Sequence, residues 1–321
     1  MSFPRRRESR PKKRWIPAFA RMTDQKRVMA QETLRKPDWM KRRLPRSVGQ
    51  QPLTGLLRDL DLVTVCEEAR CPNRSECFAH GTATFMILGD TCTRKCGFCA
   101  VTKGIPKAPD PDEPKRLAEA VRRMGLRHAV ITSVNRDDLK DGGSNHWAAV
   151  VRETRKLNPT TSIEVLTPDF LGHLDQVDTL LNAGPDVYNH NIETVPSHYL
   201  RVRPAARYER SLRLLAHVKH SSPKTLTKSG LMLGLGEMRA EVLQVLRDLR
   251  ANKVDMITIG QYLQPAPGKL LIERFVSPQE FEDYRYEAML MGFSSVASGP
   301  YIRSSYNASE TFLDAVGGSG A

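Results

Sequence analysis

All six cysteines of this 321-residue chain lie between positions 66 and 99. They form two triplets of different spacing: Cys66, Cys71 and Cys77 in the pattern C-x4-C-x5-C, then Cys92, Cys96 and Cys99 in the pattern C-x3-C-x2-C. Thiolates hold iron–sulfur clusters, and a cubane cluster has four irons to ligate. Three cysteines therefore leave one iron of a cubane open to a ligand that is not protein, and an open iron is a place for chemistry.

Disulfide bonds and a structural zinc site are the alternatives for such a dense group of cysteines. Disulfide frameworks are typical of short secreted chains, whereas this chain is long and has no signal peptide of the usual form. The first triplet together with His80 would make a Cys3His zinc set. Zinc ligands usually come in C-x2-C pairs, and neither triplet contains one that is paired with another. The spacing therefore favours iron–sulfur clusters.

The net charge of +13 is concentrated at the start of the chain. Residues 1–50 carry 16 Lys and Arg against 4 Asp and Glu, so the remainder is almost neutral and gives no sign of nucleic-acid binding. Residues 1–33 fit a basic disordered extension, an organelle transit peptide or upstream sequence translated from a misassigned start. We favour an accessory bacterial extension that does not decide function. No apolar run approaches the roughly 20 residues that span a bilayer, so we expect no membrane segment.

Short β-prone stretches alternate with amphipathic helical patterns through the rest of the chain. The expected strands are Thr84–Leu88, Ala129–Val134, Ser162–Leu166, Val187–Ile192, Lys228–Leu235 and Met256–Tyr262. The expected helices are Pro114–Met124, His146–Leu157, Leu174–Ala183, Glu209–Lys219 and Glu241–Asn252, and a helical rhythm over residues 53–66 leads into Cys66. Six such units predict an α/β fold, a partial (β/α)6 TIM-type barrel.

Polar and glycine residues follow five of these strands. They are the cysteine loop 90–99, Asn135–Asp138, Asn189–Thr194, Gly234–Glu237 and Gln261–Gln264. Because the carboxyl ends of barrel strands build the active site, we expect these segments to meet there.

The second triplet, with Phe98 before its last cysteine, resembles the signature of radical S-adenosylmethionine (SAM) enzymes. The first triplet, paired with Arg303-Ser304-Ser305-Tyr306, is similar to the lipoyl synthase family within that group. The resemblance extends from about Arg35 to Tyr306. It implies an N-terminal segment 34–81 that binds an auxiliary cluster, a radical SAM partial barrel over 82–300, and a C-terminal segment 301–321 that supplies a further ligand.

The resemblance implies two [4Fe–4S] clusters and SAM as cofactors. Cys92, Cys96 and Cys99 would hold the first cluster, whose open iron binds the methionine end of SAM; one electron then releases a 5′-deoxyadenosyl radical. The SAM contacts that we expect are Asn191 and Glu193 at the ribose, Arg203 at the carboxylate, and the turn from Gly234 to Glu237 at the adenine. For Glu193 an ion pair with a barrel arginine, and for Gly234 a simple loop turn, remain alternatives.

Cys66, Cys71 and Cys77 would hold the second cluster, with Ser305 as its fourth ligand by resemblance. An alkoxide is a hard ligand for a site that prefers soft thiolates. A labile ligand is expected if that iron must be shed when the cluster donates sulfur, which would make Ser305 a catalytic residue. Without the family pattern, a hydrogen-bonding surface hydroxyl would be the preferred interpretation of Ser305.

The implied reaction is that of a cytoplasmic sulfurtransferase, which inserts two sulfur atoms at C6 and C8 of an octanoyl chain on a carrier lysine. The carrier would be a lipoyl domain of a 2-oxoacid dehydrogenase or the glycine-cleavage H protein, and the electron donor a flavodoxin or ferredoxin. Neither nucleic acid nor membrane is an expected partner.

Three segments depart from the family pattern, namely Asn135-Arg-Asp-Asp-Leu-Lys140, Arg203-Pro-Ala-Ala206 and Pro265-Ala-Pro-Gly-Lys-Leu-Leu271. None includes a cluster ligand, and the last affects carrier or acyl-chain contacts. Biotin synthases share the Asn-His-Asn and Gly-Leu-Gly-Glu elements but lack the first triplet and Arg-Ser-Ser-Tyr. A tRNA methylthiotransferase would bring additional RNA-binding sequence. A non-catalytic ferredoxin would ligate every iron with cysteine, and a zinc-stabilised scaffold is the other non-catalytic alternative.

Overall fold

The computed structural model describes residues 34–41, 51–65, 71, 73, 76–77 and 82–317, and for 51–54 the backbone alone. The chain divides into the units Met1–Leu34 and Arg35–Ala321, and the fold described below is that of the second unit. The predicted extension 1–33, Cys66 and His80 lie outside the described residues.

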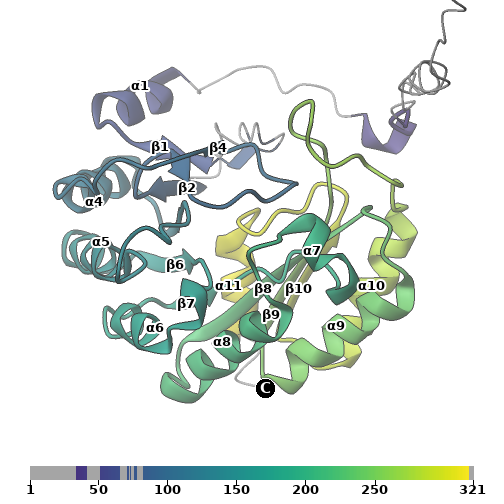
Figure 1. Ribbon diagram of the computed structural model, residues 1–321. Coiled ribbons are helices and arrows are strands. Elements are labelled where there is room, and N and C mark those ends of the chain that lie inside the picture. The colour runs from purple at the N-terminus through teal and green to yellow at the C-terminus, as the bar shows by residue number, and fades with distance from the viewer. Residues whose placement is uncertain are drawn as a thin grey trace, which may run out of the picture. The chain divides into compact units, whose positions relative to one another are not determined.

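Seven consecutive parallel strands form the centre of the molecule (Figure 1). They are β2 (Thr82–Ile87), β5 (His128–Ser133), β6 (Ser162–Leu166), β7 (Val187–Asn189), β8 (Leu226–Leu233), β9 (Met256–Gln261) and β10 (Ser295–Gly299). A short strand β1 (Val63–Thr64) pairs antiparallel with β2, so the sheet runs from β1 to β10 with an edge at each end. An open sheet of this order is the predicted partial barrel, and it contains all six expected strands.

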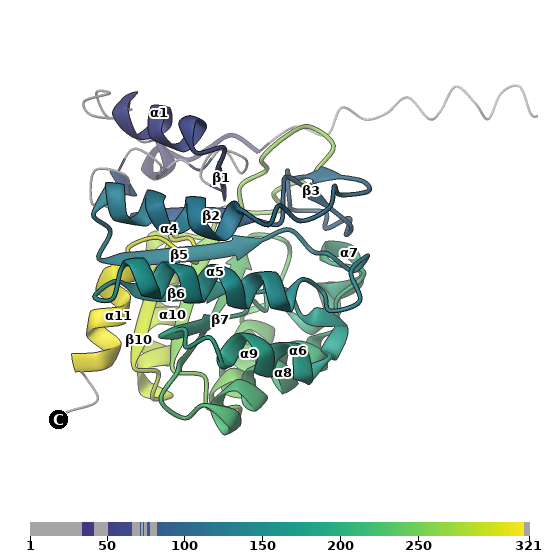
Figure 2. The same ribbon diagram turned by 90° about the vertical axis from the view of Figure 1, so that its left-hand side faces the viewer.

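Helices cover the outer face of the sheet, as Figures 1 and 2 show. They are α4 (Glu113–Met124), α5 (Ser144–Leu157), α6 (Leu174–Leu181), α8 (Tyr208–Ser221), α9 (Arg239–Ala251) and α10 (Pro278–Leu290). Helix α1 (Gln51–Asp59) packs beside α4, and the short helix α7 (Tyr199–Val202) lies at one end of the strands. Short 3-10 turns are found at Asp38–Met40, Phe170–Gly172 and Pro196–His198. The apolar stripe of each long helix forms the core against the strands; in α4 it consists of the fully buried Leu117, Ala120 and Val121. None of the described helices combines the length and apolar content that crossing a bilayer requires.

Helix α11 (Ala308–Gly317) covers the end of the sheet where the strands begin. Its Ala315 packs in one cluster with Val187 and Met256, and the ring of Phe312 lies 5.5 Å from that of His128. These three partners stand at or beside the first residues of β7, β9 and β5. Figure 2 shows α11 at this end and the small strand β3 (Thr91–Cys92) with α7 at the opposite end, where the chemistry is expected.

A buried ion pair lies inside the barrel. Lys228 Nζ lies 3.1 Å from both carboxylate oxygens of Glu164, and both side chains are completely buried. Asn189 Nδ2 donates to Glu164 Oε1 at 2.8 Å, and His128 Nε2 lies 3.3 Å from Oε2. Burial alone would raise the pKa of Glu164, but the Lys228 charge and these hydrogen bonds outweigh it and lower the pKa. The interior is thus specified by a network of buried polar groups as well as by apolar packing.

Candidate functional site

The second cysteine triplet lies on a loop held directly above the strand ends. Cys92 belongs to β3, which pairs with β4 (Thr102–Lys103), and Gly104 N donates to Cys92 O at 3.1 Å. The backbone N–H of Asn135, just after β5, donates to Cys92 Sγ at 3.4 Å. Backbone donors of this kind stabilise a thiolate, so the loop that follows β5 supports the first cysteine of the triplet.

Gly97, between the second and third cysteines, is hydrogen-bonded to two other segments of the chain. Its N–H donates to Val202 O at 2.9 Å, and its carbonyl accepts from Leu270 N at 3.1 Å. A Cβ at this position would lie 2.9 Å from Leu270 Cγ, closer than real Cβ contacts come. Glycine is therefore needed here for the approach of the 265–275 loop.

The cysteines share their surroundings with two of the predicted SAM contacts. Burial raises the pKa of Cys96 to about 11, an effect that the charge of Arg203 opposes and those of Cys99 and Glu193 reinforce. These side chains are thus close enough to interact electrostatically. Arg203 Nη1 donates to Asn191 O at 2.7 Å, while its Nε is buried and has no hydrogen-bond partner within the described residues.

Asn191 and Glu193 follow β7 and turn toward each other. Glu193 has a φ of 68°, and its backbone bridges to β8 through a hydrogen bond from Glu193 N to Gly230 O at 2.9 Å. Burial raises the pKa of Glu193, and the charge of Arg203 counteracts this. Asn191 Nδ2 donates to Glu193 Oε1 at 3.2 Å, whereas the buried Asn191 Oδ1 has no partner in the part of the chain that the structure describes.

Glu237 is directed into its own turn. Its two carboxylate oxygens accept from Gly234 N at 2.6 Å and Leu235 N at 2.9 Å, and the side chain is buried. Gly234 has a φ of 101°, and a Cβ there would lie 2.1 Å from Gln261 Nε2. The carboxylate therefore shapes the turn after β8, and an adenine contact in this region would come from the backbone that Glu237 holds.

The segment 301–306, which carries the Arg-Ser-Ser-Tyr motif, contacts two residues that lie between Cys71 and Cys77 in the sequence. Asn73 Nδ2 donates to Tyr301 O at 2.6 Å, and Tyr306 Oη donates to Glu76 Oε1 at 2.9 Å. Arg303 is close enough to Cys71 for their charges to interact, although burial lowers the pKa of Arg303 overall. Ser305 is half-buried in the turn, and its hydroxyl makes no hydrogen bond to any described residue.

The described cysteines do not converge on a single ion. None of Cys71, Cys77, Cys92, Cys96 and Cys99 forms a disulfide, and no three His, Cys, Asp or Glu side chains among the described residues are grouped to hold one metal ion. A zinc site needs such convergence, whereas each cysteine of a cubane ligates a different iron. The second triplet, together with the unpartnered Asn191 Oδ1 and Arg203 Nε, therefore fits a cluster with an attached polar ligand better than it fits a lone ion.

Three residues of this region received no role in the sequence analysis. Ser304 accepts a hydrogen bond of 2.7 Å from Asn191 Nδ2. Gly230 and Gly260 lie within β8 and β9 where segment 302–304 approaches them. An isolated glycine within a strand pattern is a signal of close backbone approach, so the two glycines could have been singled out from the sequence.

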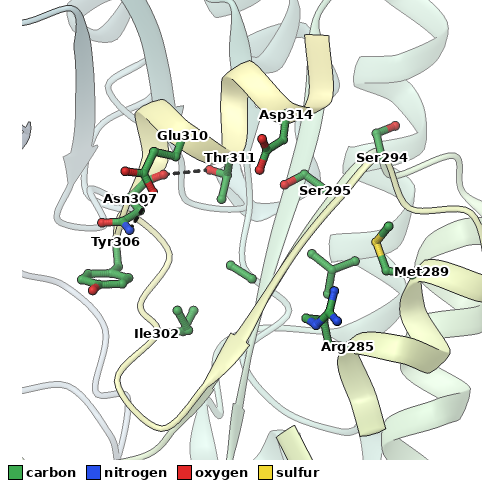
Figure 3. A pocket seen from close by; sticks show the side chains of 12 residues that line it. Arg285, Met289, Ser294, Ser295, Ile302, Tyr306, Asn307, Glu310, Thr311 and Asp314 are labelled. Atoms are coloured by element: carbon green, nitrogen blue, oxygen red, sulfur yellow. Dashed lines mark hydrogen bonds between the residues drawn. The ribbon is translucent and has the colours of Figure 1, made fainter. Parts of the chain in front are cut away.

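A cavity of about 340 Å³ lies beside β10. Residues of α10, β10 and α11 line it, together with Ile302 and Tyr306 from segment 301–306 (Figure 3). Asn307 Nδ2 donates to Glu310 Oε2 at 2.9 Å on the α11 side. The cavity contains none of the predicted SAM contacts.

Comparison with known proteins gives matches along most of the chain. The model of the radical SAM superfamily matches residues 86–249, and that of the N-terminal domain of lipoyl synthase matches residues 10–71. The chain is 54% identical over 280 residues to a lipoyl synthase of Yersinia enterocolitica and 54% identical over 280 residues to one of Rubrobacter xylanophilus, in each case over 87% of both chains.

The fold is also found in solved structures of distant sequence. Methylornithine synthase aligns with a TM-score of 0.52 at 15% identity, over 78% of this chain and 76% of that one. SuiB of Streptococcus suis, bound to S-adenosylmethionine, aligns with a TM-score of 0.52 at 12% identity, over 68% and 52%. At these identities the likeness concerns the fold alone.

Proposed function

Because the chain belongs to the lipoyl synthase family of radical SAM enzymes, we propose a specific division of its residues between two iron–sulfur sites. The family's reaction inserts two sulfur atoms, at C6 and C8, into a protein-bound octanoyl group. In our proposal Cys92, Cys96 and Cys99 hold the cluster that binds SAM. The observation that carries this assignment is the hydrogen bond from Gly97 N to Val202 O at 2.9 Å, which holds the cysteine loop against the residue that precedes Arg203.

The neighbouring side chains suit the polar groups of SAM. When bound, the cluster and SAM together supply the radical that abstracts hydrogen from an unactivated carbon. Arg203 keeps a buried, unpartnered Nε for a carboxylate, and Asn191 keeps an unpartnered Oδ1 beside Glu193 for ribose hydroxyls. Gly234 and Glu237 present the turn backbone to the adenine. Buried donors and acceptors without protein partners are costly unless a ligand satisfies them, which supports this assignment.

We assign Cys66, Cys71, Cys77 and Ser305 to the auxiliary cluster that donates sulfur. In support, Tyr306 is hydrogen-bonded to Glu76, next to Cys77, and Asn73, which lies between Cys71 and Cys77 in the sequence, donates to Tyr301 O. The free hydroxyl of Ser305 is available as a ligand because no described residue occupies it.

We further propose that the octanoyl carrier is a lipoyl domain or an H protein, that a flavodoxin or ferredoxin supplies electrons, and that the enzyme acts in the cytoplasm. A reducing compartment suits thiolate ligands because it keeps them from forming disulfides.

Mass spectrometry of an octanoylated carrier peptide tests the assignment. Reconstituted protein should convert the peptide to its lipoyl form, and Ser305→Ala should still release 5′-deoxyadenosine but form almost no lipoyl product. Ser294→Ala, which removes an exposed hydroxyl outside both sites, is the control and should behave as wild type. Undiminished lipoyl product from Ser305→Ala would show that the serine is only a surface hydroxyl.

A further inference from the structure

One hydrogen bond joins the two proposed sites directly. Asn191 Nδ2 donates to Ser304 Oγ at 2.7 Å, across 113 residues of sequence. The same amide group donates to Glu193 Oε1 at 3.2 Å. With both acceptors on its nitrogen side, the amide has one favoured orientation, which leaves Oδ1 as the atom offered to a ligand.

A glycine in the neighbouring strand β8 leaves space for this contact. A Cβ on Gly230 of β8 would lie 2.6 Å from Asn191 Oδ1 and 2.9 Å from Ser304 Oγ, both closer than real Cβ contacts come. Only glycine leaves room for the two side chains to meet above β8. The contact therefore depends on two residues that are far apart in the sequence, Ser304 and Gly230.

The segment that carries Ser304 is also hydrogen-bonded to residues from the N-terminal part of the chain, around the first cysteine triplet in sequence. Tyr306 Oη donates to Glu76, Tyr301 Oη donates to Met40 O at 2.5 Å, and Asn73 Nδ2 donates to Tyr301 O at 2.6 Å. Ser304 thus occupies the point where the auxiliary-cluster segment meets the SAM-binding end of β7.

We propose that Ser304 is a positioning residue that orients the Asn191 amide toward SAM and, through the same bond, fixes the neighbouring Ser305 at the auxiliary cluster. This inference rests on the proposed function, because it assigns Asn191 to SAM and Ser305 to the cluster. In this proposal Ser304 is not itself a ligand of SAM or of the cluster. It acts only through its neighbours Asn191 and Ser305.

A double-mutant cycle on the dissociation constant of SAM tests the inference without depending on turnover. Ser304→Ala should weaken SAM binding about five- to tenfold, the effect of losing one buried hydrogen bond. In an Asn191→Ala background the same substitution should have almost no further effect, because the bond is already absent. Anaerobic equilibrium dialysis gives the constants, iron analysis shows whether both clusters are present, and Ser294→Ala serves as the control.

The outcomes separate this inference from the proposed function. Failure of the reconstituted wild type to bind SAM would refute the proposed function itself. Unchanged SAM affinity in Ser304→Ala, or equal losses in both backgrounds, would overturn the role of Ser304 alone. If Ser304→Ala does not fold by circular dichroism, Gly230→Ala tests the same contact from the strand: it should weaken SAM binding likewise, and wild-type affinity in that variant would refute the inference.

Discussion

Gly260→Ala should disable the auxiliary site, while SAM cleavage measured at saturating SAM is kept. Gly260 lies in β9, and a Cβ there would stand 2.1 Å from Ile302 O, whereas real Cβ contacts lie beyond 3.0 Å. The carbonyl must therefore retreat by about 1 Å, at a cost of about 1–3 kcal/mol for overpacking. Arg303 Nη1, which donates to this carbonyl at 2.6 Å, must follow it.

Displacement of this size moves Ser305, and misplacement by about 1 Å can lower a rate on the order of 100-fold. We expect a comparable loss of lipoyl product with 5′-deoxyadenosine formation largely kept, and iron falling from about eight toward about four per chain. Gly299→Ala is a matched control, since Gly299 is the register partner of Gly260 and a Cβ there would meet Ile302 Cγ1 at an ordinary 3.4 Å. Full iron content and product formation in Gly260→Ala would refute the reasoning.

Three further perturbations give distinct results. Alanine at the cysteines of the 92–99 triplet should abolish 5′-deoxyadenosine formation, whereas alanine at those of the 66–77 triplet should leave it and eliminate lipoyl product; equal loss in both folded variants would contradict the division. Lys228→Met should lower the free energy of unfolding by about 3–5 kcal/mol in urea titrations, since it leaves the Glu164 carboxylate buried without its cation, and adding Glu164→Gln should restore much of it. Burial, assisted by the charge of Arg203, lowers the pKa of His190 to about 4. The unfolded chain therefore binds the extra proton first, and stability should fall as pH drops from about 6.5 to about 4; His190→Gln should flatten thermal melting temperatures over that range, and an unaltered slope would exclude this origin.

The sequence predicted β2 and the strands β5 to β9 because their apolar runs alternate with long helices, whereas the two-residue strands β1, β3 and β4 were not predicted. It did not predict β10, whose Ser-Val-Ala-Ser-Gly sequence contains a single strong strand former. Helix α10 was also missed although Ser277 and Glu280 form a capping box at its start. Large apolar side chains occur on all sides of this helix, because Phe281 and Tyr284 are buried whereas Leu290 is exposed. The sequence therefore lacks a clear helical repeat of apolar residues.

The site was predicted at the level of strand ends and not at the level of contacts. The polar residues that follow β5, β7 and β8 do lie at the same end of the sheet, as a parallel fold requires. The inward direction of Glu237 and the bond between Asn191 and Ser304 depend on turn geometry and on packing between distant segments. Neither has a periodic signature along the chain.

The contacts of segment 301–306 have a consequence for biosynthesis. They join Met40, Asn73 and Glu76 to Tyr301 and Tyr306 across 261, 228 and 230 residues. A chain that emerges from the ribosome N-terminus first cannot form them until residue 306 has been released, long after the 92–99 loop and β2 have appeared. In the proposed assignment, Ser305 would reach the cysteines at 71 and 77 only after nearly the whole barrel has been translated, so the auxiliary site would be completed as one of the last steps of folding.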